Sequence, residues 1–342
     1  MAIIDKPSDY FNTVLYTGDG TNPRAITGVG FQPDWVWNKP RSAANSHALL
    51  DSVRGATKFL SSDVTDAEYT YGHSIQSFDS DGFTCGDNAS FNQNGTTYAS
   101  WNWLGANGTS SNTDGSISST VSANTTSGFS IVSYTGNGTD NATVGHGLSQ
   151  KPDMVIIKAR ENTSSWVTWH KDLTGSDYLL FLDGTDAQSQ YTTILKNQSA
   201  SLLTLGTNSA SNANTQGFIS YNFHSVQGYS KFGSYTGNGN ADGTFVYTGF
   251  KPAFVMVKNT GAAENWIIFD NRRPGYNLTD ALLKPNLSNA ESTTGVKFDM
   301  LSNGFKARVS DAEGNSSGGN FIYMCFASNP FVTSTGVPAT AR

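Results

Sequence analysis

One five-residue phrase occurs three times in this chain and limits its fold more than any other feature. It reads YTGDG at residues 16–20, YTGNG at residues 134–138 and YTGNG again at residues 235–239. Repeats spaced by roughly 100 residues are too long for a solenoid, whose units have about 20 to 50 residues, and suit a small domain. The chain is therefore expected to consist of copies of one unit.

Two further blocks set the bounds of each copy. An apolar run between a proline and a lysine follows the first phrase, as PDWVWNK, PDMVIIK and PAFVMVK at residues 33–39, 152–158 and 252–258. A closing block reads YASWNWLG, FISYNFHS and FIYMCFAS at residues 98–105, 218–225 and 321–328. We therefore define repeat 1 as residues 16–105, repeat 2 as 134–226 and repeat 3 as 235–328. The remainder is an N-terminal arm (1–15), a connecting segment (106–133) and a C-terminal tail (329–342).

The pattern within each repeat is typical of β-structure. Short runs rich in Val, Ile, Phe, Tyr and Trp recur about every ten residues and end at Gly, Asn, Asp or Pro. Because Pro and Gly interrupt these runs so often, no helix is expected beyond a short turn near residues 280–283. We predict an all-β fold of three tandem small antiparallel β-sandwiches, of jelly-roll or immunoglobulin-like type. The strands expected in repeat 1 are residues 14–17, 35–39, 47–51, 58–61, 75–79, 83–86 and 98–104.

The connecting segment between repeats 1 and 2 is poor in apolar side chains. Residues 106–127 read ANGTSSNTDGSISSTVSANTTS, which offers little apolar burial to offset the entropy of ordering. We expect a linker or exposed arm rich in Ser, Thr, Asn and Gly, with strand structure only around residues 117–121. By contrast, only residues 226–234 separate the closing block of repeat 2 from repeat 3, so these two repeats are expected to pack rigidly.

Uncharged polar residues dominate the composition. Charged residues make up 14% of the chain, yet the mean hydropathy is −0.36, because Ser, Thr, Asn, Gln and 35 glycines supply the polarity. Such a composition is typical of β-rich extracellular proteins. The net charge of −6 and the scattered Lys and Arg argue against nucleic acid as a partner. The N-terminus lacks a signal-peptide pattern and no window approaches about 18 apolar residues, so no membrane insertion is expected.

Tryptophan and asparagine side chains are the candidate ligand contacts, because an indole face can stack on a sugar ring. The four tryptophans in the blocks of repeat 1 align with other large apolar residues in repeats 2 and 3, so we expect them in the core: Trp35, Trp37, Trp101 and Trp103. Three tryptophans outside these blocks are kept as candidates: Trp166, Trp169 and Trp266. Binding residues often lie in loops, and the loops at 88–97 and 208–215 add Asn92, Asn94 and Asn212.

No catalytic, cofactor or metal site is predicted. The sequence FDSDGF at residues 78–83 begins like a calcium loop but lacks the later ligands, and an Asp-Gly hairpin turn explains it. The five histidines have no zinc-ligand spacing, and the glycine pairs of the YTG phrases lack the rest of a phosphate loop, so we interpret them as tight hairpin turns. Cys85 and Cys325 occupy non-equivalent positions and are expected to be buried thiols.

Several phrases together resemble a repeat family of virion proteins from marine tailed bacteriophages, of the cyanophage and pelagiphage type. They are SDYFNTVLYTGDG, GFSIVSYTGNG, VGHGLSQKPDMVIIKAR, WVTWHKDL, GYSKFGSYTGNG and NPFVTSTGVPATAR, and they extend from about residue 6 to residue 342. The resemblance implies a place in the virus particle after assembly in the bacterial cytoplasm, which needs no signal peptide. It transfers no catalytic motif.

Three functions remain open at this point. The first is a non-enzymatic tail fibre or receptor-binding protein that presents loops to a glycan or protein of the host surface. The second is a capsid decoration or head fibre protein, and the third is a tail-associated enzyme that degrades polysaccharide. The expected partners are other virion proteins, and a homotrimer is expected because closed symmetry is the rule for such assemblies.

Overall fold

The computed structural model describes residues 3–274 and 276–338, and antiparallel sheets make up nearly all of the regular structure. The expected all-β class is therefore confirmed. Among the described residues, the helical elements are a 3₁₀ turn, η1 (Pro7–Asp9), and a single α-helical turn, α1 (Ser209–Asn212). The helical turn expected near residues 280–283 is wrong, because Leu282 and Leu283 form bridges to Ser292 and Ile268.

Repeat 1 forms a four-stranded sheet of order β1-β9-β3-β4 and a three-stranded sheet of order β2-β8-β7. The first sheet contains β1 (Phe11–Thr17), β9 (Thr97–Trp103), β3 (Trp35–Pro40) and β4 (Ala48–Asp51). The second contains β2 (Arg24–Thr27), β8 (Gly82–Cys85) and β7 (Ile75–Asp79), and a separate short pair consists of β5 (Lys58–Phe59) and β6 (Tyr69–Thr70). All seven strands expected in this repeat are present, and β2 and β6 were not expected.

Repeat 2 contains the same strand order within a larger sheet. Its eight strands run β10-β11-β12-β20-β14-β15-β16-β17, and a three-stranded sheet runs β13-β19-β18. The larger sheet contains β10 (Ser110–Asn112), β11 (Ser119–Asn124), β12 (Phe129–Thr135), β20 (Gly217–Phe223), β14 (Met154–Ala159), β15 (Val167–His170), β16 (Tyr178–Phe181) and β17 (Ser189–Gln190). The smaller contains β13 (Thr143–Gly145), β19 (Leu202–Leu205) and β18 (Leu195–Gln198).

Repeat 3 again has a four-stranded and a three-stranded sheet. They run β21-β27-β23-β24 and β22-β26-β25. The first contains β21 (Ser230–Thr236), β27 (Asn320–Pro330), β23 (Phe250–Asn259) and β24 (Ile267–Asp270). The second contains β22 (Phe245–Tyr247), β26 (Gly304–Ala307) and β25 (Phe298–Leu301). In all three repeats the first strand therefore pairs with the last one, which pairs in turn with the strand of the proline block.

The register of the central strand pair is the same in the three repeats. Trp35 lies opposite Trp103, Met154 opposite Phe223, and Phe254 opposite Phe326. The sequence blocks aligned on their proline and closing motifs are thus also aligned in space. This equivalence allows the three repeats to be compared residue by residue.

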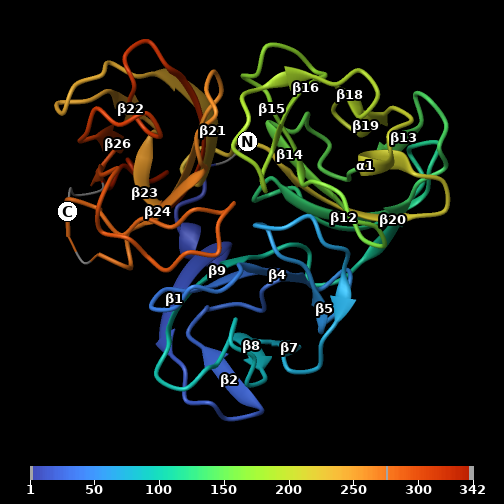
Figure 1. Ribbon diagram of the computed structural model, residues 1–342, viewed down its shortest axis with the longest axis horizontal. Coiled ribbons are helices and arrows are strands. Elements are labelled where there is room, and N and C mark those ends of the chain that lie inside the picture. The colour runs from blue at the N-terminus through green and yellow to red at the C-terminus, as the bar shows by residue number, and fades with distance from the viewer. Residues whose placement is uncertain (1–2, 275, 339–342) are drawn as a thin grey trace.

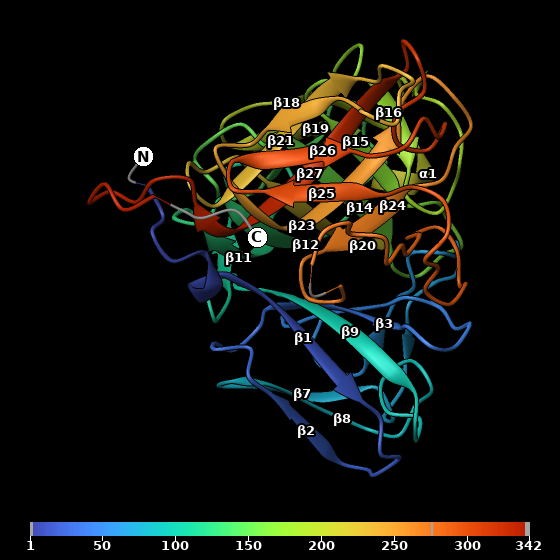
Figure 2. The ribbon, with the colours of Figure 1, turned by 90° about the vertical axis from the view of Figure 1, so that its left-hand side faces the viewer.

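Each four-stranded arrangement is buried on both faces. In repeat 1, one face packs on the three-stranded sheet, where Val36 and Leu50 meet Ile26 and Phe83 in one apolar cluster. Figure 2 shows β1, β9 and β3 lying between the strands β2, β7 and β8 and the rest of the molecule. Because alternate side chains point to opposite faces, the tryptophans of β3 and β9 are directed to the other repeats.

The three repeats meet in a shared aromatic core. Figure 1 shows them as three groups of strands, coloured blue to cyan, green to yellow and orange to red, around a common centre. The ring centroids of Trp35 and Tyr221 are 4.4 Å apart, and those of Phe11 and Phe326 are 5.1 Å apart. Trp35, Trp37, Trp101 and Trp103 are fully buried here, so their expected packing role is confirmed.

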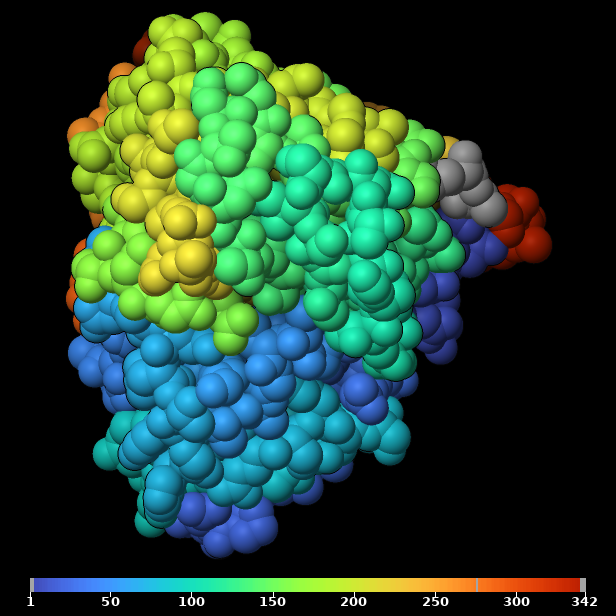
Figure 3. Space-filling view, turned by 90° about the vertical axis from the view of Figure 1, so that its right-hand side faces the viewer, coloured from blue at the N-terminus to red at the C-terminus, as the bar shows by residue number. Residues whose placement is uncertain are grey.

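The segments outside the repeats are more ordered than expected. The connecting segment supplies β10 and β11. β11 pairs with β12 along its whole length, with Ser119 opposite Tyr134 at one end and Asn124 opposite Phe129 at the other. Figure 3 shows this segment, in teal, lying on the surface next to repeats 1 and 2. Residues 11–15 of the expected N-terminal arm belong to β1, so repeat 1 begins at Phe11 in the structure, and β27 extends to Pro330. Residues 1–2 and 339–342 lie outside the described residues.

Candidate functional site

The YTG phrases form corners at which the chain passes from the larger sheet to the smaller one. In repeat 1 the phrase joins β1 to β2, but β1 pairs with β9 and β2 pairs with β8. The expected hairpin turns are therefore wrong. The tyrosine hydroxyls anchor each corner by donating to backbone oxygens: Tyr16 to Phe91 (2.8 Å), Tyr134 to Ser211 (2.7 Å) and Tyr235 to Gly314 (2.6 Å).

A buried asparagine holds the glycine end of each corner. Its Oδ1 accepts a backbone N–H of the YTG phrase, from Asp19 to Asn92 (3.0 Å), from Asn137 to Asn212 (2.9 Å) and from Asn238 to Asn315 (3.0 Å). Asn92 and Asn212, two of the candidate ligand contacts, are thus buried structural residues. Asn94, beside Gly20, is exposed and remains available to a ligand.

The three candidate tryptophans lie in the interior. Trp166 and Trp266 are 0% and 1% exposed, and Trp169 is 3% exposed. The Trp166 indole donates to the Ser61 carbonyl at 2.8 Å and the Trp266 indole to the Phe181 carbonyl at 2.9 Å, so each links its own repeat to the preceding one. The Trp169 indole donates within repeat 2, to the Gly175 carbonyl at 3.2 Å. Buried indoles cannot stack on a sugar at the surface, so the structure does not place these three side chains at a sugar-binding surface.

Two clusters of buried charge lie between repeats. Arg54 contacts Asp51 at 2.5 Å and Glu68 at 3.1 Å, and Glu68 also pairs with Arg160 of repeat 2 at 2.8 Å. The Tyr221 hydroxyl donates to Asp51 at 2.7 Å. Because both members of the Arg54–Asp51 pair are fully buried, the cluster fixes the orientation of β4 against repeat 2.

The second cluster repeats this arrangement between repeats 3 and 1. Arg273 contacts Asp270 at 2.6 Å and Glu291 at 3.1 Å, Arg41 pairs with Glu291 at 2.8 Å, and the Trp101 indole donates to Asp270 at 3.0 Å. These residues were not expected from the sequence. Aligning Asp51 with Asp270 would have revealed the recurrence, because each is followed three residues later by an arginine.

The lysine of the proline block is buried in every repeat. Lys39, Lys158 and Lys258 are fully buried, and each donates to the backbone carbonyl of the next residue, at 2.8, 2.9 and 2.6 Å. Burial lowers the pKa of each ammonium to about 8. A second carbonyl supports each amine, and for Lys39 and Lys158 it comes from a neighbouring repeat: Ser288 and Thr65.

Three buried histidines are held in the neutral form. The Nδ1 atoms accept N–H donors, from the Trp37 indole to His47 (2.8 Å), from Leu148 to His146 (3.3 Å) and from Asp172 to His170 (3.2 Å). Burial lowers the pKa of His146 and His170 to about 4 and that of His47 well below its usual range. A proton on Nδ1 would face an N–H group, so these rings are poor proton carriers.

The remaining sequence expectations concern turns, thiols and metals. The β7–β8 hairpin places Asp79 opposite Gly82, and Asp81 accepts N–H groups from Gly28 and Gly30, so the predicted turn is confirmed. Cys85 and Cys325 are free and buried, as expected. Within residues 3–274 and 276–338, no cluster of three or more His, Cys, Asp or Glu could hold a metal ion. Over the same ranges, no helix has the length and apolarity needed to cross a membrane.

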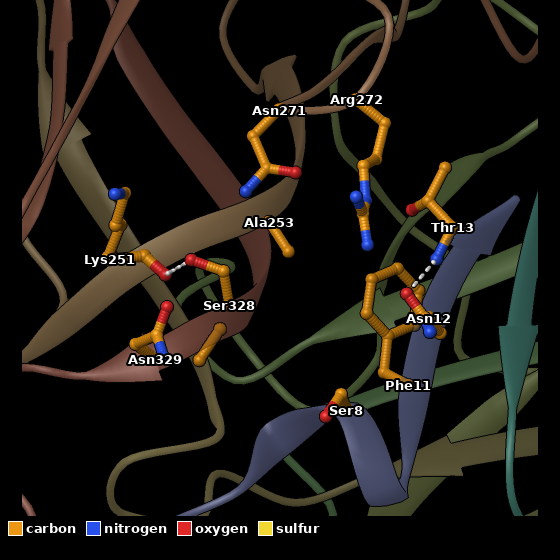
Figure 4. A pocket seen from close by; sticks show the side chains of 11 residues that line it. Ser8, Phe11, Asn12, Thr13, Lys251, Ala253, Asn271, Arg272, Ser328 and Asn329 are labelled. Carbon is orange, nitrogen blue, oxygen red and sulfur yellow. Dashed lines mark hydrogen bonds between the residues drawn. The ribbon is translucent and has the colours of Figure 1, made fainter. Parts of the chain in front are cut away.

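The surface carries a groove between repeats 1 and 3. It has a volume of about 260 Å³ and lies between the start of β1 and the ends of β23, β24 and β27. Figure 4 shows Asn12 and Thr13 on one side and Lys251 and Asn329 on the other. Most of the described lining residues are polar, and the lining carries positive but no negative side chains, so the groove suits a polar or anionic ligand.

Comparison with known proteins gives a family without an assigned activity. A family model described as "Domain of unknown function (DUF7483)" matches residues 6–330. The chain belongs to this family. The matched range takes in all three repeats together with the connecting segment. No curated protein and no solved structure matches the chain.

In this DUF7483 member, the groups with strongly lowered pKa values and the accessible polar side chains lie in different parts of the molecule. The histidines and lysines with strongly lowered pKa values are buried and hydrogen-bonded to backbone groups, or in His47 also to the Trp37 indole, rather than grouped in a cleft. Accessible polar side chains gather instead in the groove between repeats 1 and 3 and in the corner loops near Asn94. These surfaces are the candidate binding sites.

Proposed function

We propose that the three pairs of sheets are copies of one β-sandwich unit around an approximate threefold axis, and that the chain is a bacteriophage virion protein that contacts the host surface. Its sequence resemblance favours a tail fibre or receptor-binding protein. The repeat phrases of residues 6–342 support the virion assignment. A rigid scaffold with ordered loops supports the binding role.

The observation that carries this proposal is a cyclic set of contacts between the repeats. Backbone N–H groups of one repeat donate to the next repeat at equivalent places: Glu68 to Arg160 (2.6 Å), Gln188 to Thr260 (2.9 Å) and Glu291 to Arg41 (2.8 Å). Ring N–H groups donate in the opposite direction, to the preceding repeat, from Trp166 to Ser61, from Trp266 to Phe181 and from His47 to Lys284. Three equivalent interfaces give one platform whose loops keep fixed positions.

The oligomeric state belongs to the same proposal. A chain that already contains three units around an axis can sit on a threefold or pseudo-threefold position of a particle, and a homotrimer of chains would extend this arrangement. Light scattering of the purified protein distinguishes a monomer of 36.6 kDa from a trimer. A monomer in solution would contradict the homotrimer and leave the virion assignment untouched.

The experiment that tests the function is gold labelling of intact phage with an antibody against the recombinant chain, combined with an adsorption assay. Label at the tail, together with reduced adsorption when free protein competes for cells, would support host attachment. Label over the head would instead assign capsid decoration. Absence of the protein from purified particles would refute both, and shortening of host polysaccharide by the purified protein would assign an enzyme.

A further inference from the structure

A carboxylate present in two repeats is missing from the third. The residue before the equivalent pairs Trp35–Trp103, Met154–Phe223 and Phe254–Phe326 is Asp34 in repeat 1, Asp153 in repeat 2 and Ala253 in repeat 3. Asp34 Oδ2 accepts the backbone N–H of Gly105 at 2.8 Å and that of Asn107 at 2.9 Å. Asp153 Oδ2 accepts the N–H of Ser225 at 2.7 Å. Both repeats therefore place a carboxylate at the end of the closing block.

Repeat 3 has the groove at this position. Ala253 lines it together with Ser328, the residue equivalent to Gly105 and Ser225. The methyl group of Ala253 leaves unfilled the space that a carboxylate takes in the other repeats. The groove of about 260 Å³ is near the lower end of small-ligand sites, about 300 to 1,000 Å³, and suits a ligand the size of a sugar unit.

The charge of the groove also differs from that of the equivalent places. Arg272 lines the groove, whereas the equivalent residues are Val53 in repeat 1 and Asp172 in repeat 2. Figure 4 shows the Arg272 side chain extending between Ala253 and the Phe11–Thr13 segment of repeat 1. Lys251 adds a second positive charge, and none of the described lining residues is acidic.

A buried hydroxyl at the groove provides an independent indication of a ligand. Thr13 is 6% exposed, and its Oγ1 has no hydrogen-bond partner among the described residues. Figure 4 shows this hydroxyl on the side of Thr13 that faces Arg272. Buried polar atoms normally have partners. A ligand oxygen held by Arg272 would supply one to Thr13.

We propose that this groove binds the carboxylate of an acidic sugar, which takes the place that Asp34 and Asp153 fill in the other repeats. Arg272 pairs with the carboxylate in the forked geometry that guanidinium groups favour. The neutral polar side chains around it, Ser8, Asn12, Asn271 and Asn329, are suited to sugar hydroxyls. The carboxylate site stands on the groove itself, and only the host polysaccharide as its natural source rests on the proposed function.

Calorimetric titration of the full chain with a galacturonic acid tetrasaccharide tests the proposal, with neutral maltotetraose and inorganic sulfate as comparison ligands. We expect heat of binding for the acidic tetrasaccharide, and dissociation constants at least about tenfold weaker for both other ligands. Arg272→Gln removes the forked partner and Ala253→Asp supplies an internal carboxylate, so each should weaken binding about tenfold or more. Arg308→Gln is the matched control, because Arg308 is a surface arginine outside the groove.

Absence of binding to the acidic tetrasaccharide, or binding that both groove variants retain, would overturn the proposal. Sulfate binding as tight as that of the tetrasaccharide would overturn its sugar part. Circular dichroism of the two variants checks that they fold, and Ala253→Asp introduces only the residue type that repeats 1 and 2 already contain. Binding in solution without any effect on phage adsorption would contradict the attachment function and leave the carboxylate site standing.

Discussion

At the scale of single residues, both glycines of the YTGxG phrase are required by the corner they form. A Cβ on the first glycine would lie 2.1 to 2.4 Å from a backbone oxygen of the opposing loop, at Gly18, Gly136 and Gly237; the closest of these is Gly18. The second glycine has positive φ values of +73°, +69° and +65° at Gly20, Gly138 and Gly239. Only glycine meets both conditions without strain. The repetition of this phrase therefore reflects backbone geometry.

Substitution of the first glycine should be strongly destabilising. In Gly136→Ala the new methyl group would be 2.4 Å from the Ala213 carbonyl oxygen, so the corner has to open. We expect the free energy of unfolding to fall by roughly 2 to 4 kcal/mol in urea titrations. Gly72→Ala is the control, because no atom lies within 4 Å of the position that its Cβ would take and its φ is not positive; it should change stability by less than about 0.5 kcal/mol. Equal stability of the two variants would show that the corner tolerates a side chain.

The buried neutral histidines predict a loss of stability in acid. Because the folded-state pKa values of His146 and His170 are lowered to about 4, the unfolded chain binds protons between pH 6.5 and pH 4 that the folded chain does not. The stability contribution is therefore complete above pH 6.5 and is lost as the pH falls toward 4. In His146→Gln the slope of unfolding free energy against pH should be smaller by up to about 1.4 kcal/mol per pH unit in this window. An unchanged slope would show that His146 is protonated in the folded protein.

At the scale of elements, buried charge orients each sheet against its neighbour. Asp51 and Asp270 are the last residues of equivalent strands, β4 and β24, and each is neutralised by the arginine three residues later. The third interface has His170 at the equivalent position, where its Nε2 atom lies 3.3 Å from the Tyr323 carbonyl. The three interfaces thus share equivalent backbone hydrogen bonds. They differ at the last residue of the fourth strand, which is an aspartate paired with arginine in two repeats and a histidine bonded to a carbonyl in the third.

Breaking one charge cluster should cost far more than breaking a surface ion pair. Arg54→Ala leaves Asp51 buried without its partner, so we expect a loss of roughly 3 to 5 kcal/mol in unfolding free energy. Lys196→Gln, which removes a partly exposed pair with Asp140, is the matched comparison and should cost less than about 1 kcal/mol. Both values come from chemical denaturation at neutral pH. A similar small loss for the two variants would mean that Asp51 is solvated once Arg54 is removed.

Elements with strong apolar patterns were predictable from the sequence, and those formed by backbone pairing were not. The seven apolar strands of repeat 1 follow from its sequence, but β2 has one buried residue, Ile26, and β6 has none. The connecting segment forms β10 and β11 because the edge of β12 offers hydrogen bonds that need no apolar side chains. The segment at 280–283, expected as a turn, is extended because Leu283 pairs with Ile268 of β24.

The candidate sites were less predictable, because residue type alone does not report burial. Trp166 and Trp266 are suited by type to sugar stacking, yet both bridge repeats. The substitution of Asp34 and Asp153 by Ala253 is visible in the aligned proline blocks PDW, PDM and PAF, but its meaning depends on the groove that forms between repeats 1 and 3. Contacts between distant segments thus decide which residues are accessible.

At the scale of the whole molecule, the larger sheets of the three repeats bury one another. The face of each that points away from its own three-stranded sheet packs against the other repeats. This explains why the proline blocks are apolar on consecutive positions rather than alternating, since β3, β14 and β23 are buried on both faces. One apolar cluster contains residues of all three repeats, from Phe11 and Trp35 through Tyr221 to Phe326. No repeat can keep its large aromatic side chains from water without the other two.

This shared core predicts that the chain unfolds as one unit, although its length would allow separate domains. Removing repeat 1 from the others would expose Trp35, Trp37, Trp101 and Trp103, which are fully buried in the intact chain. Urea unfolding followed by tryptophan fluorescence, which reports the interfaces, and by far-ultraviolet circular dichroism, which reports the sheets, should give coincident transitions. The destabilised variant Arg54→Ala should shift both curves to lower urea by the same amount, because the interface it weakens belongs to the common core. A fluorescence transition that precedes the loss of β-structure would instead mean that the repeats separate before they unfold.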